Sequence, residues 1–298
     1  MKVLEISTAV SIQNIAFPTD LSAESYAALP FAADFAKRYG AKIWGFHVVA
    51  PHEYGKRPYR DMPTIEKDVQ ATGHELALEF EKRLAGIPNE VKVLEYGETW
   101  HALSSFIKEN DIDLLVMGTH GRTGLGKAML GSVAENVFRQ CQCPVLTVGP
   151  KVTHRLDQLT APKEILYATD FTIASRAAAP YAISQAEQQG AHLVLLHVIE
   201  NPKAGELAFG GEFVDAATHL LHELVPPDAN LSSKPEEIVK FGAPADVILG
   251  LAQERNADLI VLGVRKPEGN LALATHFGRA TAYRVVSEAK CPVLTVRG

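Results

Sequence analysis

The chain has 298 residues, close to twice the commonest domain size of roughly 100–150 residues, so two domains are the first expectation. Hydrophobic residues make up 47% of the chain and charged residues 21%, which excludes disordered, collagen-like and coiled-coil proteins. The net charge of −6 is divided evenly between the halves and no apolar run could cross a membrane, so we expect neither nucleic acid nor a membrane as a partner.

Strand-like and helix-like patterns alternate along the first half. Ser22 is expected to cap the first helix and Gly40 to end it. Runs such as Leu114–Met117 are apolar throughout, which is typical of strands buried on both faces of a parallel sheet. In chain order the predicted elements are a strand at Ile12–Pro18, a helix at Ser22–Tyr39, a strand at Ile43–Val49, a helix at Thr64–Ala85, a strand at Val91–Tyr96, a helix at Thr99–Glu109, a strand at Leu114–Gly118, a helix at Ser132–Gln140 and a strand at Pro144–Val148.

The second half repeats the first. The six residues Cys143–Val148 recur unchanged as Cys291–Val296, and earlier pairs such as Thr19-Asp20 and Thr169-Asp170 fall in the same order. Such a long period indicates two duplicated domains rather than a solenoid. The sequence therefore predicts two tandem, doubly wound α/β domains with open parallel sheets of the Rossmann-like or flavodoxin-like kind, at 1–150 and 163–298.

A glycine-rich loop follows the fourth predicted strand. Gly118, Gly121 and Gly131 have the spacing G-x2-G-x9-G and are followed by Ser132, at the start of a predicted helix. In doubly wound sheets, ligands bind at the carboxyl ends of the strands where the strand order reverses. Glycines let the backbone approach a ligand closely, and a helix N-terminus favours phosphate. The loop therefore predicts a phosphate site; the alternative is that its glycines only end the strand and form a loop.

Two other nucleotide-binding motifs fit less well. The stretch Gly121–Ala128 nearly matches the P-loop pattern, but Ala128 has no hydroxyl to offer a magnesium ion. The first strand ends in Pro18-Thr19-Asp20 rather than in the G-x-G-x-x-G of a dinucleotide site, which argues against NAD.

Together these motifs resemble the universal stress protein family. The resemblance rests on Pro18-Thr19-Asp20 after the first strand, His47-Val48 at the end of the second, the glycine loop, and the terminal strand that begins with Cys143 or Cys291. It covers both halves and implies a tandem universal stress protein whose halves form an intramolecular pseudo-dimer, with a homodimer as a further option. One branch of this family binds ATP through the glycine motif.

The resemblance also implies a set of binding residues in the first half, together with a Mg or Mn ion on the phosphates whose protein ligands stay unassigned. The residues expected around adenine and ribose are Pro18, Thr19, Asp20 and Val48; those along the ribose and phosphates are Met117, Gly118, His120 and Gly121; those on the phosphate chain are Arg122, Gly131, Ser132 and Val133. No catalytic residue is assigned.

The corresponding loop of the second half has a different composition. Lys266 stands in place of the second glycine, and the third glycine, taken as Gly278, is followed by Arg279 instead of Ser. By the family's pattern this half has lost the motif, and we expect a mainly structural domain. The alternative is an anion-binding pocket formed by Arg265, Lys266 and Arg279.

We expect an ATP-binding regulator or binding module of the stress response, without turnover or with slow turnover, because no general base is evident. The alternatives are a slow ATPase or phosphotransferase, with Asp20 on the metal and Ser132 or His120 near the γ-phosphate, and a nucleotide-free scaffold. Capping of the following helix is a competing role for Asp20 and its counterpart Asp170. The segment Pro51–Pro63 is either a lid over the nucleotide or an ordinary exposed loop.

Three cysteines in a long chain predict free thiols rather than a disulfide framework, and the first residues lack a signal-peptide pattern, so we expect a cytoplasmic protein. For Cys141 and Cys143, a C-x-C pair, packing is the first expectation and metal or redox use the alternative. His47 and His197 end equivalent strands and are interpreted as structural histidines with satisfied hydrogen bonds.

Overall fold

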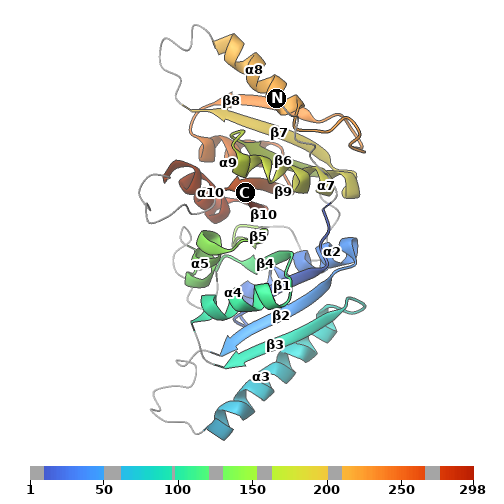
Figure 1. Cartoon of the computed structure of the whole chain (residues 1–298), viewed down its shortest axis with the longest axis vertical. Helices are drawn as coiled ribbons and strands as arrows, with labels where there is room; N and C mark the ends of the chain where they lie inside the picture. The colour runs from blue at the N-terminus through green and yellow to red at the C-terminus, as the bar shows by residue number, and fades with distance from the viewer. Residues whose placement is uncertain are drawn as a thin grey trace. The chain divides into compact units, whose positions relative to one another are not determined.

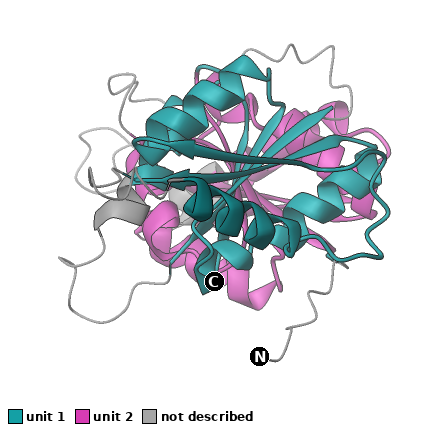
Figure 2. Ribbon diagram, turned by 90° about the horizontal axis from the view of Figure 1, so that it is seen from above, with its two compact units in different colours: residues 1–10, 151–298 teal, residues 11–150 magenta. Residues whose placement is uncertain are grey.

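The computed structural model describes residues 10–49, 62–95, 98–120, 130–152, 163–200, 210–265 and 276–298; of these, the side chains of residues 62–66, 68, 95, 210 and 276–280 are not described. The chain divides into two compact units, shown in different colours in Figure 2. The N-terminal unit spans 11–150, and the described residues of the C-terminal unit are those from 151 to 298 together with Val10. None of the described helices is long and apolar enough to span a membrane.

The N-terminal unit is an α/β domain with a parallel sheet in the strand order β3-β2-β1-β4-β5 (Figure 1). The chain adds β2 and β3 on one side of β1, then returns and adds β4 and β5 on the other, so the order reverses between β1 and β4. The strands are β1 (Asn14–Pro18), β2 (Lys42–Val49), β3 (Asn89–Glu95), β4 (Leu114–Gly118) and β5 (Val145–Val148), and the helices are α1 (Ala23–Tyr26), α2 (Leu29–Tyr39), α3 (Met62–Arg83), α4 (Thr99–Glu109) and α5 (Ser132–Gln140).

Aromatic side chains on both faces of this sheet form its core. Phe17 of β1 lies 5.9 Å, between ring centroids, from Phe80 of α3. Phe46 of β2 lies 4.8 Å from Phe106 of α4. Phe17 is paired with Gly45, the residue before Phe46, so the two phenylalanines point to opposite faces. Helices α3 and α4 therefore cover opposite faces of the sheet, as a doubly wound fold requires.

One predicted helix is in fact two helices. The sequence predicts a single helix at Ser22–Tyr39, whereas the chain forms α1 and α2 with a break between them. Pro30 lies in the first turn of α2; in a continuous helix it would have no N–H to donate and its ring would meet the carbonyl of Tyr26. The predicted ends are confirmed, because Ser22 accepts a hydrogen bond from the Ser25 N–H and Gly40 closes α2 with a φ of 66°.

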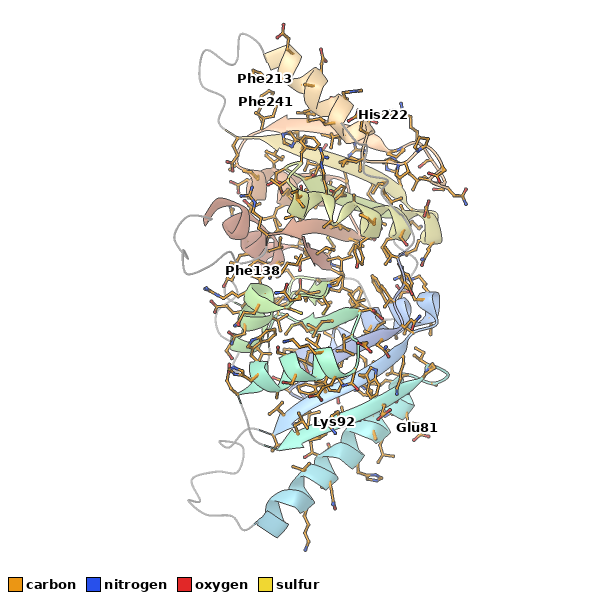
Figure 3. All side chains as sticks on the ribbon, viewed as in Figure 1. Glu81, Lys92, Phe138, Phe213, His222 and Phe241 are labelled. Carbon is orange, nitrogen blue, oxygen red and sulfur yellow. The ribbon has the colours of Figure 1, made fainter. Side chains whose placement is uncertain are left out.

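The C-terminal unit has the same architecture, with the strand order β10-β9-β6-β7-β8. Its strands are β6 (Glu164–Thr169), β7 (His192–Ile199), β8 (Glu236–Phe241), β9 (Leu259–Val264) and β10 (Val293–Arg297), and its helices are α6 (Ile173–Arg176), α7 (Ala179–Gln189), α8 (Gly210–His222), α9 (Pro244–Glu254) and α10 (His276–Glu288). Pro180 divides α6 from α7 as Pro30 divides α1 from α2. Phe213 of α8 and Phe241 of β8 are exposed (Figure 3). The predicted fold class, two tandem doubly wound α/β domains, is confirmed.

Candidate functional site

Most of the predicted binding residues lie at the carboxyl ends of three neighbouring strands in the N-terminal unit. Strand β1 pairs with β2 on one side and with β4 on the other. The residues concerned are Pro18, Thr19 and Asp20 at the end of β1, Val48 near the end of β2, and Met117, Gly118 and His120 at the end of β4. This edge is the place where the strand order reverses, so the structure brings these residues to the ligand-binding position of a doubly wound sheet.

Three groups of residues named above lie outside the described structure. They are Gly121 to Ala128 of the glycine loop, including Arg122, Pro51 to Asp61 of the proposed lid, and Lys266 of the second loop. Met62 and Pro63 belong to α3, and the backbone of Gly278 and Arg279 belongs to α10.

A tight turn at residues 19–22, the β1 turn, leads from β1 into α1. The Thr19 Oγ1 accepts a hydrogen bond from the Leu21 N–H at 2.9 Å and lies 2.7 Å from the Ser25 Oγ. The Asp20 Oδ1 accepts from the N–H and the hydroxyl of Ser22, at 3.0 and 2.5 Å. Leu21 takes the left-handed conformation, with a φ of 64°. Ser22, not Asp20, is therefore the N-cap of α1. Asp20 stabilises this cap by accepting hydrogen bonds from Ser22.

His47 ties the end of β2 to the β1 turn. Its Nδ1 lies 2.8 Å from the carbonyl oxygen of Thr19, and a carbonyl can only accept, so this nitrogen carries the proton. The side chain is buried. The interpretation of His47 as a structural histidine with a satisfied hydrogen bond is confirmed, and the same holds for His197, whose Nδ1 lies 2.9 Å from the Thr169 carbonyl oxygen.

Thr119 organises the end of β4, and the sequence analysis missed it. Its N–H donates to the Val148 carbonyl at 3.0 Å, and its carbonyl accepts from the Gly131 N–H at 2.9 Å. Its hydroxyl lies 2.9 Å from the Nδ1 of His120. Thr119 therefore joins β5, the beginning of α5 and His120. A hydroxyl residue that directly follows an all-apolar strand is the signal that could have identified it.

The beginning of α5 has the features of an anion site. Gly131 is the N-cap and makes no side-chain capping bond, so the first N–H groups of this nine-residue helix depend on other partners. Glu135 lies in the first turn but pairs with Arg139 at 2.7 Å. The Nε2 of His120 is buried and has no hydrogen-bond partner among the residues that the structure describes. Buried polar atoms are normally paired, so this nitrogen indicates a missing partner.

The comparison with known protein families covers both units. The model of the universal stress protein family matches residues 11–149 and again residues 162–297. The chain belongs to the universal stress protein family. It contains two tandem universal stress protein domains, as the sequence motifs predicted.

Individual relatives are similar to one domain or to the whole chain. A universal stress protein of Methanocaldococcus jannaschii is 32% identical over 139 residues, which cover 46% of this chain and 81% of the relative. One from Thermus aquaticus is 37% identical over 142 residues, 45% of this chain and 98% of the relative. A universal stress protein from Archaeoglobus fulgidus has a similar fold along the chain, with a TM-score of 0.69, 23% identity and coverage of 95% of this chain and 98% of that one.

The second universal stress protein domain has different residues at the equivalent strand ends. Arg265 follows β9 at the position that His120 has after β4, and its guanidinium lies 3.5 Å from the Asp170 carboxylate. Burial opposes ionisation of Asp170, but hydrogen bonds from Thr172 and Ser175 and the charge of Arg265 outweigh burial and hold the pKa of Asp170 below its ordinary value. An ion pair therefore joins the turn after β6 to the residue that follows β9.

The next residue of the same turn makes an aromatic contact. The ring of Phe171 stacks on the ring of His197, with centroids 4.4 Å apart. In the first domain the equivalent residue is Leu21, which has no ring to place over His47.

The short helix after the first strand also packs more closely in the second domain. A Cβ atom added to Gly118 would lie 3.1 Å from the backbone oxygen of Glu24 in α1. A Cβ atom added to Gly263 would lie only 2.2 Å from the backbone oxygen of Ala174 in α6 and 2.3 Å from the Ser175 Cα. The space between helix and strand is therefore wider at Gly118 than at Gly263.

Proposed function

We propose that the N-terminal domain binds ATP at the carboxyl ends of β1, β2 and β4, and that the chain acts as a nucleotide-dependent regulator or binding module of the stress response. The observation that carries this proposal is the buried Nε2 of His120, which lacks a partner among the described residues. His120 follows Thr119, which hydrogen-bonds both to His120 and to Gly131 at the start of α5. This helix start has no side-chain capping bond.

The residues at this edge fit the parts of a nucleotide. The backbone N–H groups at Ser132 and Val133, the Ser132 hydroxyl and the helix dipole favour a phosphate group. Val48 and Met117 are apolar residues near the ends of β2 and β4, a character that suits contact with a base or a ribose. A Mg or Mn ion on the phosphates would neutralise their charge. Its protein ligands stay unassigned, since the Asp20 Oδ1 accepts hydrogen bonds from Ser22 within the β1 turn.

The same reasoning assigns one nucleotide site to each chain. In the C-terminal domain the Asp170–Arg265 pair and the Phe171–His197 stack lie at the ends of β6, β7 and β9, the positions equivalent to the proposed site. A nucleotide there would have to break the ion pair and displace the ring. We therefore propose a structural role for the second domain.

The test is a calorimetric titration of the full chain with ATP and magnesium, compared with the His120→Ala variant. We expect binding by the unaltered chain and a loss of about tenfold in affinity in the variant, the effect of one hydrogen bond of about 1.4 kcal/mol. His101→Ala is the matched control, because His101 is exposed on α4 and pairs with Glu98, three residues before it in the chain. Absence of binding by the unaltered chain would overturn the proposal.

A further inference from the structure

Two cysteines meet at the junction between α5 and β5. Cys141 is the C-cap of α5, and its N–H donates to the Val137 carbonyl at 2.9 Å. The chain then passes through the exposed Gln142 and bends at Cys143 before β5 begins. Because of this bend both thiols point to the same side, and their sulfur atoms lie 3.3 Å apart. Figure 3 shows α5 with its residue Phe138 labelled, one turn before the pair.

The separation of the two sulfur atoms is that of a hydrogen-bonded thiol pair. It exceeds a disulfide bond of about 2.05 Å by little more than 1 Å. No third His, Cys, Asp or Glu joins the pair as a metal-binding cluster within the described part of the chain. The arrangement therefore suits a reaction between the two sulfurs better than metal coordination, which needs further ligands.

We infer that Cys141 and Cys143 are a redox-active dithiol, which a small disulfide such as oxidised glutathione converts into an intramolecular Cys141–Cys143 disulfide. The inference is independent of nucleotide binding. Cys143 is the attacking residue because it is partly exposed, whereas Cys141 is buried.

The reaction proceeds in two exchange steps. The Cys143 thiolate attacks one sulfur of the small disulfide, whose S–S bond breaks; a mixed disulfide forms, and the first small thiolate leaves and takes up a proton. The Cys141 sulfur, as thiolate, then attacks the Cys143 sulfur and expels the second small thiol. Two electrons pass from the protein sulfurs to the reagent, and both protons end on the released thiols. The second step is rapid because the sulfurs are already neighbours.

The environment of the pair makes the first step slow at neutral pH. The hydrogen bond with Cys141, followed by burial, raises the pKa of the Cys143 thiol far above its ordinary value. Since only the thiolate attacks, the rate should rise about tenfold for each pH unit between pH 7 and 9. The pair therefore responds to a sustained oxidising environment rather than to a brief pulse of oxidant.

The second domain supplies an internal control. Cys291 occupies the position of Cys143, but Ala289 stands where Cys141 would be. Burial, followed by the charge of Asp258, raises the pKa of the Cys291 thiol to about 12. Cys291 thus has a similar environment without a neighbouring thiol. The same comparison shows that Cys141→Ala reproduces a natural arrangement of this fold, so this variant should fold.

The experiment equilibrates the full chain in mixtures of reduced and oxidised glutathione, quenches with acid, alkylates the denatured chain and counts the labelled thiols by mass spectrometry. The unaltered chain has three cysteines. We expect it to keep one labelled thiol, Cys291, and to be lighter by two hydrogen atoms before labelling. Cys291→Ser should form the same disulfide, whereas Cys141→Ala should form none and keep Cys143 as a thiol or as its glutathione adduct.

Three results would overturn the inference. The first is retention of all three thiols in the most oxidising mixture. The second is a stable glutathione adduct on Cys143 of the unaltered chain, which would show that Cys141 does not displace it. The third is a disulfide that disappears in Cys291→Ser, since it would then join other partners.

Discussion

The two domains have one fold and different strand ends. Both begin with a strand, a turn closed by a hydroxyl and a carboxylate, a short helix and a second helix that starts at a proline. The hydrogen bonds of the turn are the same, with Asp20 holding Ser22 in one domain and Asp170 holding Thr172 in the other. The turn is thus a requirement of the fold, and its aspartate is no sign of ligand binding by itself.

The difference lies in the residues that face this turn. The N-terminal domain has His120 after β4, hydrogen-bonded to Thr119, whereas the C-terminal domain has Arg265 at the equivalent position after β9 and joins it to Asp170 by an ion pair. Duplication has therefore preserved the scaffold while a few residues at the strand ends changed its chemistry. The following predictions test that contrast, from the largest effect to the smallest.

The largest effect is expected for Gly131→Val. Gly131 has a φ of −61° and a ψ of 156°, which valine adopts, and an added Cβ would lie 3.5 Å from the Thr119 carbonyl oxygen, an ordinary contact. The fold should therefore persist, while the valine side chain blocks the approach of phosphate to the start of α5. We expect ATP affinity to fall by at least about 100-fold, or some 2.8 kcal/mol, in a calorimetric titration. Wild-type affinity in a folded variant would place the phosphates elsewhere.

A matched pair of glycine variants tests the difference in packing. In Gly263→Ala the new Cβ meets backbone atoms at 2.2 and 2.3 Å, so α6 must shift, and we expect a loss of about 3 kcal/mol in the free energy of unfolding. In Gly118→Ala the nearest atom is at 3.1 Å, and the loss should be about 1 kcal/mol.

Chemical denaturation separates the two glycine variants. Both tryptophans, Trp44 and Trp100, lie in the N-terminal unit, so their fluorescence follows that unit, whereas far-UV circular dichroism follows both. An equal or larger loss in Gly118→Ala than in Gly263→Ala would contradict the difference in width between the two sites.

The smallest effect is expected for Asp170→Asn. The pKa of Asp170 is lowered in the folded chain, so its ionised form stabilises the fold above the unfolded pKa of about 3.9, and this stabilisation is lost as the pH falls through the folded value. Both partners of the pair with Arg265 are about half exposed, which limits the loss at pH 7 to about 1 kcal/mol.

Thermal unfolding over a range of pH measures this loss. The difference between the unaltered chain and Asp170→Asn should be largest near neutral pH and vanish below the pKa of Asp170. Asp215→Asn, on the exposed side of α8, is the control and should show little change. A difference that persists unchanged in acid would mean that the charge of Asp170 contributes nothing.

Much of the fold could be predicted from the sequence. Helices α4 and α5 and strand β4 have the predicted bounds, because uninterrupted apolar runs and helical spacing are local signals. The break before α2 could also have been predicted, since Pro30 cannot lie inside a helix without disrupting it.

The site was less predictable. Motif spacing identified residues at neighbouring strand ends, but the role of Thr119 depends on contacts with β5 and α5, and the pairing of Asp170 with Arg265 depends on two strands becoming neighbours. The closer approach of α6 to Gly263 depends on the distance at which this helix packs against the sheet. The spacing of residues in the sequence does not predict that distance. The binding roles of all the predicted site residues, ATP as the ligand, the metal ion, the pseudo-dimer, a homodimer and a cytoplasmic location stay predictions.

The number of ATP molecules bound to each chain tests the central contrast most directly. Equilibrium dialysis of the full chain against labelled ATP with magnesium should give one molecule per chain, and Gly131→Val should reduce this to none at the same ATP concentration. Two molecules per chain would contradict the closure of the second domain by Arg265 and Asp170. One molecule retained in Gly131→Val would mean that ATP binds outside the N-terminal site proposed above. No bound ATP in the unaltered chain would contradict the proposal of nucleotide binding itself.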